Sequence, residues 1–398
     1  MNRMLGLVLF STLLTALAFL VLRGLWPALR TRRGVGAFWA TTAVVHLAFL
    51  GGWFLHTRSG GALGMLTRGA LTAWSVAALV SVVAGALLRL VGAAHARLRL
   101  ARAPAPAEPV DPQRRQFLYG LAVPAAAATV GAGGTMAGMS GFEVRHEEVR
   151  LRGLPQALDG FRIGQLTDVH VGEFIDVEYV RGAVRALDAA GVDLQVMTGD
   201  LIDDLTQLDA TLDALQECTA QHGMLAILGN HEKWRGLRKV LAGYARVAPR
   251  GRLRLLVDQS EVLLHGGHPL RVVGMDYPMG THGRHRLPRE QRQEKMRASA
   301  ERAWAGVSPD ETVLCLTHHP DFFPVAAERG ARLTLAGHTH GGQVGLWRIP
   351  LFSFAFEYML GRYRRGDSHL YVSSGTGHWF PFRVGIPTEV TVLTLRAA

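Results

Sequence analysis

The sequence contains little cysteine. Only Cys218 and Cys315 occur among its 398 residues. Two cysteines so far apart are too few for a disulfide framework or for a thiolate metal cluster. The chain also shows no internal repeat of the length found in solenoid proteins, which argues against a stacked-repeat architecture.

Negative charge is also scarce. The chain has 32 acidic residues against 43 lysines and arginines, which gives a formal net charge of +11. Such an excess can indicate nucleic-acid binding, but much of the arginine lies between long apolar segments in the first third of the chain. Positive charge in that position is better explained by membrane orientation. We therefore expect a lipid bilayer, and no nucleic acid, among the partners.

Three long apolar stretches dominate residues 1–100, at about 4–22, 36–55 and 69–88. A helix needs ~20 apolar residues to cross a bilayer core of ~30 Å, so the pattern predicts three transmembrane helices. Arginines are frequent after the first and third stretches and sparse between the second and third. Cytoplasmic loops carry most of the positive charge, so the amino terminus is expected outside the cytoplasm.

Residues 101–116 form a proline-rich segment that we interpret as a cytoplasmic linker, and it ends on Arg114 and Arg115. The apolar stretch 117–139 follows. It is either a fourth transmembrane helix or an internal signal-anchor that resembles a twin-arginine export signal. Both alternatives predict a multi-pass protein of the inner membrane whose C-terminal domain is periplasmic or extracellular. Pro124 weakens the stretch as a span, so a cytoplasmic C-terminal domain remains an alternative.

Residues 142–398 have the pattern of a layered α/β domain. Short runs rich in Val, Ile and Leu predict buried strands at 161–166, 194–197, 225–228, 270–273, 313–316, 333–335, 370–372 and 390–395. Helical patterns occur at 177–190, 205–221 and 289–304. Strand and helix alternate early in this region, and the later strands lie closer together, which suggests a second, more mixed sheet.

Polar side chains follow five of these strands. The clusters are Asp168-Val169-His170, Gly199-Asp200, Gly229-Asn230-His231-Glu232, His318-His319-Pro320 and Gly337-His338-Thr339-His340. Each cluster alone could be an ordinary turn. Ligands bind at the carboxyl ends of strands in open α/β sheets, so five such clusters in succession are expected to converge in space.

The converging residue types indicate a metal site. Asp, Asn and His without thiolates suit Mn, Fe or Zn. Seven candidate ligands are too many for one tetrahedral ion. They are the right number for two ions that share a carboxylate, at a separation of ~3.5–4 Å, and such pairs clamp phosphoryl oxygens. We therefore expect two divalent metal ions per chain.

The five clusters resemble those of the calcineurin-like metallophosphoesterase superfamily, and most closely its bacterial membrane-anchored branch with a GHTHGGQ motif and a twin-arginine-like leader. The resemblance extends from about residue 144 to the carboxyl terminus. It implies a β-sandwich flanked by helices. It also implies hydrolysis of a phosphate ester, phosphodiester or pyrophosphate by a metal-bridging hydroxide.

The resemblance also implies a role for individual residues. Asp168, His170 and His340 would hold one ion, and Asn230, His318 and His338 the other, with Asp200 bridging the two. His231 would contact the substrate phosphate and help to protonate the leaving group. His318 is chosen over His319 because the family pattern is histidine, any residue, proline. Glu232 stands where the family often has aspartate, and no role is assigned to it.

Several alternatives stay open. The basic segment 279–292 could border an anionic substrate or be a solvated face, and His378 and Trp379 fit packing or the rim of the site. The chain could also be a non-catalytic membrane receptor or accessory protein that retains a metallophosphoesterase shell. The expected partner is a phosphate-containing substrate, for which a lipid-linked phosphate is one option, and no obligate protein partner is evident.

Overall fold

The computed structural model describes residues 2–59, 62–100, 127–138, 141–279, 287–378 and 380–398. The chain divides into two compact units, Met1–Met139 and Ser140–Ala398, which are treated separately below. The predicted linker 101–116, with Arg114 and Arg115, lies outside the described residues, as do Trp379 and part of the basic segment 279–292.

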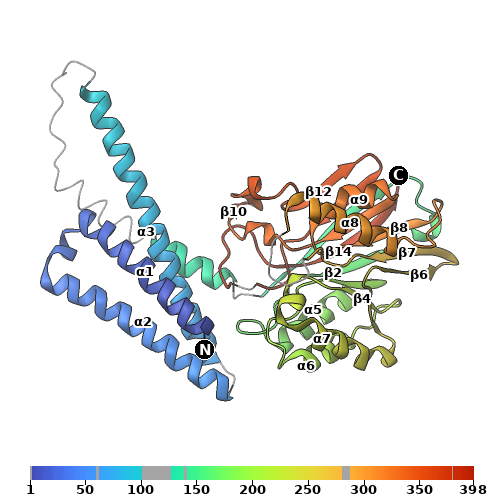
Figure 1. Cartoon of the computed structure of the whole chain (residues 1–398), viewed down its shortest axis with the longest axis horizontal. Helices are drawn as coiled ribbons and strands as arrows, with labels where there is room; N and C mark the ends of the chain where they lie inside the picture. The colour runs from blue at the N-terminus through green and yellow to red at the C-terminus, as the bar shows by residue number, and fades with distance from the viewer. Residues whose placement is uncertain (1, 60–61, 101–126, 139–140, 280–286, 379) are drawn as a thin grey trace. The chain divides into compact units, whose positions relative to one another are not determined.

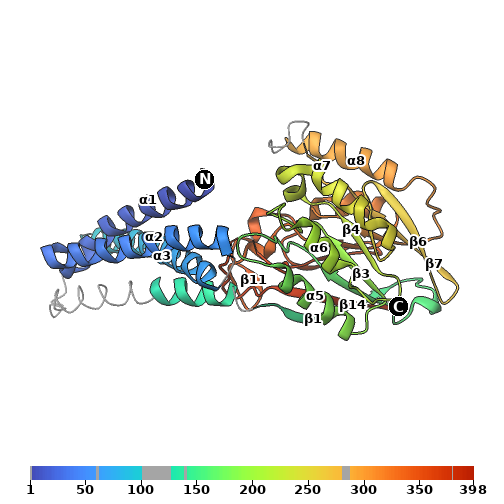
Figure 2. The same cartoon turned by 90° about the horizontal axis from the view of Figure 1, so that it is seen from below.

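The N-terminal unit consists of long helices. They are α1 (Asn2–Leu25), α2 (Arg32–Ser59) and α3 (Ala62–Leu100), and residues 127–138 are also helical. Helix α3 packs along both α1 and α2 (Figures 1 and 2). Trp74 Nε1 donates to Thr15 Oγ1 at 3.0 Å, which joins α3 to α1. Large apolar side chains such as Leu13 point outward, as expected for helices whose surroundings are apolar.

Two of these helices are long and apolar enough to cross a membrane, within the part of the chain that the structure describes. The candidate spans are Arg32–Gly51 and Gly69–Leu87, close to the second and third predicted helices. Helix α1 covers the first predicted stretch, and its apolar part within the described residues, Val8–Gly24, is shorter than this criterion requires. For the predicted anchor 117–139, only residues 127–138 are described, and they form a helix.

The C-terminal unit contains two six-stranded sheets (Figure 1). The first has the order β1 (Glu143–Leu151), β14 (Glu389–Ala397), β2 (Arg162–Leu166), β3 (Leu194–Thr198), β4 (Met224–Ile227) and β5 (Leu253–Leu255). The second has the order β12 (Gly361–Arg365), β13 (Ser368–Val372), β9 (Ala331–Ala336), β8 (Thr312–Leu316), β7 (His268–Gly274) and β6 (Gln259–His265). A short hairpin of β10 (Gly345–Leu346) and β11 (Ile349–Pro350) stands apart from both.

Each sheet contains four consecutive parallel strands. Strands β2 to β5 run in one direction in the first sheet, and β13, β9, β8 and β7 do so in the second. Their carboxyl ends therefore lie at one edge of each sheet, where the loops that follow them can meet.

The two sheets pack face to face and are covered by helices on both outer sides. In β3, Leu194 and Val196 point into the core between the sheets, whereas Met197 points to the helices, because successive side chains of a strand alternate between faces. Helices α5 (Val177–Ala189), α6 (Leu208–Leu215) and α7 (Asn230–Val247) cover the first sheet, and α8 (Arg289–Ala303) and α9 (Phe323–Glu328) cover the second. This arrangement confirms the predicted layered α/β sandwich.

Two helices of the C-terminal unit differ from the sequence-based prediction. Helix α6 covers Leu208–Leu215 and is therefore shorter than the predicted 205–221. Helix α7 was not predicted at all. It begins inside a polar cluster, at Asn230, and its regularity is broken at Gly236, whose φ is 149°.

We predict that Gly274→Ala destabilises the C-terminal unit by about 1–3 kcal/mol, the usual cost of overpacking a core. A Cβ at Gly274 would lie 2.3 Å from Leu256 Cβ and 2.9 Å from Ile227 Cγ2. The control is Gly182→Ala in helix α5, where a Cβ meets nothing within 4 Å. This control should gain roughly 0.5–1 kcal/mol. Thermal unfolding of the detergent-solubilised full chain measures both effects, and equal stability of the two variants would contradict the prediction.

Candidate metal centre

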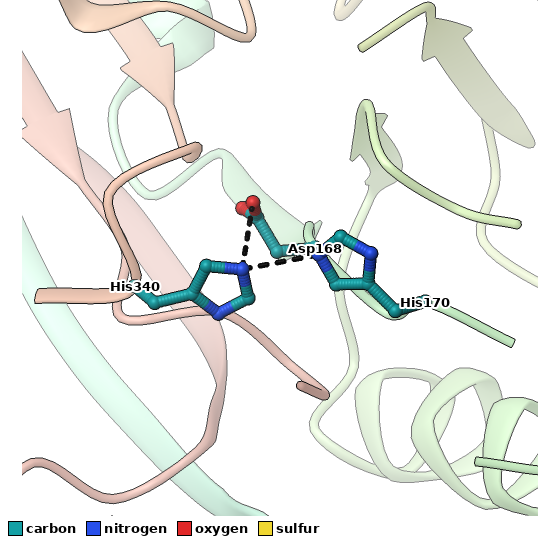
Figure 3. A group of neighbouring side chains, drawn as sticks. All are labelled: Asp168, His170 and His340. Carbon is teal, nitrogen blue, oxygen red and sulfur yellow. Dashed lines mark hydrogen bonds and ion pairs between the residues drawn. The ribbon is translucent and has the colours of Figure 1, made fainter. Parts of the chain in front are cut away.

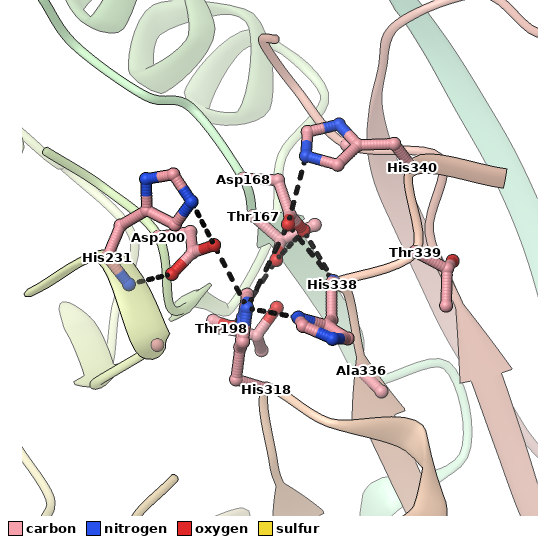
Figure 4. A network of polar contacts seen from close by, with 12 residues as sticks. Thr167, Asp168, Thr198, Asp200, His231, His318, Ala336, His338, Thr339 and His340 are labelled. Carbon is pink, nitrogen blue, oxygen red and sulfur yellow. Dashed lines mark hydrogen bonds and ion pairs between the residues drawn. The ribbon is translucent and has the colours of Figure 1, made fainter. Parts of the chain in front are cut away.

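The five polar clusters meet at one end of the sandwich (Figure 4). The first three follow β2, β3 and β4 of the first sheet, and the other two follow β8 and β9 of the second. A buried hydrogen bond from Gln165 Nε2 in β2 to the carbonyl oxygen of Ala336 in β9, 3.1 Å long, joins the two sheets beside the site. Residues far apart in the sequence therefore surround one volume.

Asp168, His170 and His340 form the first group of possible ligands (Figure 3). Their ligand atoms all lie within 4.8 Å of one another. The Nε2 atoms of His170 and His340 face each other at 3.1 Å, and His340 Nε2 lies 3.4 Å from Asp168 Oδ1. All three residues are buried. Ring nitrogens and a carboxylate oxygen that converge in this way are suited to one metal ion.

Asp200, His318 and His338 form the second group. His318 Nε2 lies 3.2 Å from His338 Nδ1 and 3.2 Å from Asp200 Oδ2. The other ring nitrogen of His318 is 2.8 Å from the carbonyl oxygen of Thr198, which only a protonated Nδ1 can approach as a donor. This contact leaves Nε2 free to act as a ligand, as is usual for metal-binding histidines.

Asp200 lies between the two groups. Its Oδ2 atom is 3.2 Å from His318 Nε2 and 3.9 Å from His170 Nε2, so one carboxylate faces a histidine ring of each group. His231 Nε2 is 3.8 Å from the same oxygen.

Asn230 provides a further sign that the site is built for cations. It is buried at the start of α7, and its Oδ1 has no hydrogen-bond partner among the residues that the structure describes. A buried carbonyl oxygen without a partner costs about 1–3 kcal/mol, and a metal ion would satisfy it. The donor set of carboxylate, amide and imidazole groups therefore fits divalent metal ions.

The backbone of the site is held in an unusual conformation. Asp168, His170, Asp200, His338 and His340 all have a positive φ, between 50° and 74°. Each non-glycine residue in this region costs on the order of 1–3 kcal/mol, so the surrounding contacts must enforce it. Strain of this kind is often found at functional sites.

Glycines before the ligands allow the loops to approach closely. A Cβ at Gly337 would lie 2.1 Å from Asp168 Oδ2, and a Cβ at Gly229 would lie 2.1 Å from Asp200 Oδ1. Any larger residue would displace the carboxylate. The glycine that precedes His338 and the one that precedes Asn230 are therefore required by packing.

Glu232, to which the sequence assigned no role, joins two of the loops. Its buried carboxylate accepts hydrogen bonds from the backbone N–H groups of Gly229, Asp200, Leu201 and Ile202, at 2.7, 3.0, 2.6 and 3.2 Å. The side chain thus ties the loop after β3 to the start of α7. Its position two residues after Asn230 was visible in the sequence, but the backbone groups that it meets were not.

Asp203, which sequence reasoning missed, orients His231. Asp203 Oδ1 lies 2.5 Å from His231 Nδ1 and also accepts from Arg235 Nε and Nη2 at 3.0 and 2.9 Å. Burial alone would lower the pKa of His231, but the charges of Asp200 and Asp203 raise it to about 9. The two carboxylates therefore favour the protonated His231 ring, and nearby cations would lower this pKa.

The buried charges of Asp200 and His318 stabilise each other. Burial would raise the pKa of the Asp200 carboxyl, but the nearby His318 and His231 rings hold that pKa well below its usual value. Burial likewise would lower the pKa of His318, and Asp200 and Asp168 raise it to about 10. Each group thus favours the charged form of the other.

The remaining candidates lie around the ligands. His319 is buried, but its Nδ1 accepts from the backbone N–H of Asp321 at 3.2 Å, and it belongs to none of the ligand groups found among the described residues. His378 is buried near Phe174. The structure also adds Arg383, a buried arginine whose Nη2 is 3.1 Å from His340 Nδ1, and Tyr277, whose ring centroid is 5.7 Å from that of His338. Neither residue belongs to a sequence motif that could have revealed it.

Comparison with known proteins identifies the class of this domain. Residues 161–342 match the family described as calcineurin-like phosphoesterase. The C-terminal unit therefore contains a calcineurin-like phosphoesterase domain, and the protein is a hydrolase of phosphoric ester bonds. Such a domain implies divalent metal ions, which agrees with the His and Asp groups described above.

Individual relatives support the same class. The chain is 29% identical over 305 residues to an uncharacterized metallophosphoesterase of Bacillus subtilis, YkuE, a match that covers 71% of this chain and 98% of that protein. It is 27% identical to the Escherichia coli phosphodiesterase YaeI, with 59% and 82% covered. It is 26% identical to a Danio rerio transmembrane protein with metallophosphoesterase domain, with 63% of this chain and 56% of that protein covered. Together with two apolar helices, the last similarity suggests membrane association.

We predict that Glu232→Ala lowers both stability and metal content, although Glu232 is not a ligand. Four buried or partly buried N–H groups would lose their acceptor, and each such loss costs about 1–3 kcal/mol. The control is Glu294→Ala on the exposed side of α8, which should change neither quantity. Metal analysis by mass spectrometry and thermal unfolding of the full chain test the prediction. Wild-type metal content in Glu232→Ala would contradict it.

A second prediction distinguishes the two adjacent histidines. His318→Ala should lose one metal ion per chain, because His318 Nε2 faces Asp200 and His338. His319→Ala should keep the wild-type metal content, because the His319 ring faces the backbone of its own loop. Metal loss in His319→Ala with retention in His318→Ala would reverse the assignment.

Proposed function

We propose that the protein is a membrane-anchored phosphoesterase with a dinuclear metal site. The observation that carries this proposal is the position of Asp200 between two groups of ligands, each of which could hold one ion. Asp168, His170 and His340 would hold the first ion, and Asn230, His318 and His338 the second. Mn, Fe and Zn suit these donors, and the donors alone do not distinguish among them. When bound, the two ions would supply Lewis-acid activation of water and of the phosphoryl group.

The protein's own side chains would hold the substrate and move a proton. His231 Nε2 points toward Asp200 at the centre of the site, and Asp203 fixes the opposite ring nitrogen. A protonated His231 in this orientation can donate to an oxygen of the substrate phosphate and then transfer its proton to the departing oxygen. Asp203 keeps Nδ1 as the nitrogen that retains its proton, so that Nε2 is the one that reacts.

The substrate class proposed is a phosphate ester, a phosphodiester or a pyrophosphate. The apolar helices of the N-terminal unit would tether the domain to the membrane. Tethering raises the effective concentration of the site at the membrane surface, which favours a phosphate carried by a lipid or another envelope component. The same helices, with their arginine distribution, support a multi-pass anchor and a C-terminal unit on the periplasmic or extracellular side.

We predict that the full chain in detergent hydrolyses p-nitrophenyl phosphate or its bis-ester when Mn, Fe or Zn is supplied. Asp200→Asn should lose the most activity together with bound metal, because it removes the shared charge. His231→Ala should lower turnover by roughly 10²- to 10⁴-fold, as expected for a general acid, while metal content stays near that of the wild type. A chain that binds no metal and turns over neither ester with any of the three ions would refute the enzyme and favour an accessory protein.

Sidedness is tested by a reporter fused after Ala398. Alkaline phosphatase at this position should be active in intact cells, because that enzyme matures only outside the cytoplasm, where disulfides form. The matched fusion with a fluorescent protein that requires the cytoplasm should be dark. The reverse pattern would place the C-terminal unit in the cytoplasm.

A further inference from the structure

An exposed apolar segment lies directly after the last ligand cluster. We call residues 345–356 the apolar hairpin. They comprise β10, a two-residue turn, β11 and the residues that follow up to Phe356. The side chains of Trp347 and Phe354 are 84% and 85% exposed. Further exposed apolar side chains belong to Leu346, Ile349, Leu351 and Phe352.

The turn of the hairpin is strained at its most exposed residue. Trp347 and Arg348 occupy the two central positions, with φ values of 47° and 65°. Asn and Gly are the residues that this kind of turn favours, and a bulky side chain in a left-handed conformation costs conformational energy. Packing does not compensate at Trp347, because most of its side chain faces solvent. We therefore attribute the exposed and strained conformation of Trp347 to a contact with something outside the C-terminal unit.

Arg348 fixes the direction of the hairpin. Its guanidinium pairs with Glu143 at 2.5 Å and with the buried Glu389. Glu143 is the first residue of β1, and Glu389 is the first residue of β14. The base of the hairpin is therefore tied to the point at which the chain enters the C-terminal unit, four residues after the N-terminal unit ends at Met139. The hairpin is thus fixed to the first strand of the C-terminal unit.

The same segment reaches the metal centre at its other end. Phe356 closes the hairpin, and its ring centroid lies 5.8 Å from that of His338 and 6.2 Å from that of His319. On the opposite side, the hairpin begins five residues after His340. A surface that contacts the hairpin would therefore lie next to the mouth of the site.

The composition of the hairpin points to a lipid bilayer as the occupant. Residues 345–356 contain Trp, Phe, Leu and Ile, one arginine and no acidic residue. Tryptophan and phenylalanine are favoured at the boundary between head groups and acyl chains, and apolar side chains of this kind can be buried there without a shaped partner surface. The chain itself supplies candidate membrane spans. A protein partner has no comparable support in the structure.

We propose that the apolar hairpin inserts into the membrane interface with Trp347 and Phe354 as its anchors, and that it directs the metal centre toward phosphate groups of membrane lipids. This inference rests on the membrane anchoring proposed above and narrows the proposed substrate class.

The test uses single labelled cysteines in the full chain. Both native cysteines are buried, so an introduced exposed cysteine can be labelled selectively. Trp347→Cys and Phe354→Cys carry a nitrobenzoxadiazole label. Leu264→Cys is the matched control, because Leu264 is 66% exposed in β6, which lies at the other end of the C-terminal unit from β10 (Figures 1 and 2). The proteins are reconstituted into vesicles of equal parts phosphatidylcholine and phosphatidylglycerol.

The label at either hairpin position should be quenched by doxyl-labelled lipid about twofold more than the control, and it should be protected from aqueous iodide. Iodide quenching equal to that of the control would refute the proposal. Protection from both quenchers would also refute it, since it would mean that the hairpin is covered by the chain's own helices or by a second copy. Hydrolysis of the bis-ester by the same vesicles tests the phosphoesterase function separately, because hairpin labelling does not require turnover.

Discussion

The burial of two carboxylates in one small volume is the constraint on which the rest of the site depends. Asp168 and Asp200 are almost fully inaccessible to water and lie close to the same histidine rings. Buried carboxylates need compensating positive charge, and the His318 and His231 rings provide it for Asp200. Cations would supply such charge and would also satisfy the unpartnered oxygen of Asn230. The arrangement is therefore best understood as a polar cavity shaped for metal ions.

The fold meets this constraint by building the site from both sheets. Loops after β2, β3 and β4 provide one side, and loops after β8 and β9 provide the other. Backbone strain at the ligands is tolerated because hydrogen bonds hold each loop, with Glu232 joining two of them and Thr167 donating to Asp168 at 2.7 Å. The stability of the sandwich is thus used to maintain a conformation that the loops alone would not adopt.

In the proposed arrangement, one short part of the chain connects the membrane with the metal centre. The segment after His340 leads into the apolar hairpin, and Arg348 ties that hairpin to the first residues of β1. If the hairpin enters the membrane interface as proposed, it links the N-terminal helices that anchor the chain, strand β1 and the metal centre mechanically. Orientation toward the bilayer would then be a property of the folded domain as well as of its tether.

The sequence by itself determined the class of the protein. The eight predicted strands, the apolar N-terminal stretches and the five polar clusters could be found because each depends on local composition or on spacing along the chain. The tertiary structure alone decided what those residues meet. The partners of Glu232, the contact between Asp203 and His231, and the approach of Arg383 to His340 join positions distant in sequence. The sequence pattern also did not predict the start of α7 at Asn230. The first turn of this helix is polar, and its apolar face is recognisable only once it packs on the first sheet. Local patterns cannot specify such contacts, since they arise only when loops from two sheets are brought to the same edge.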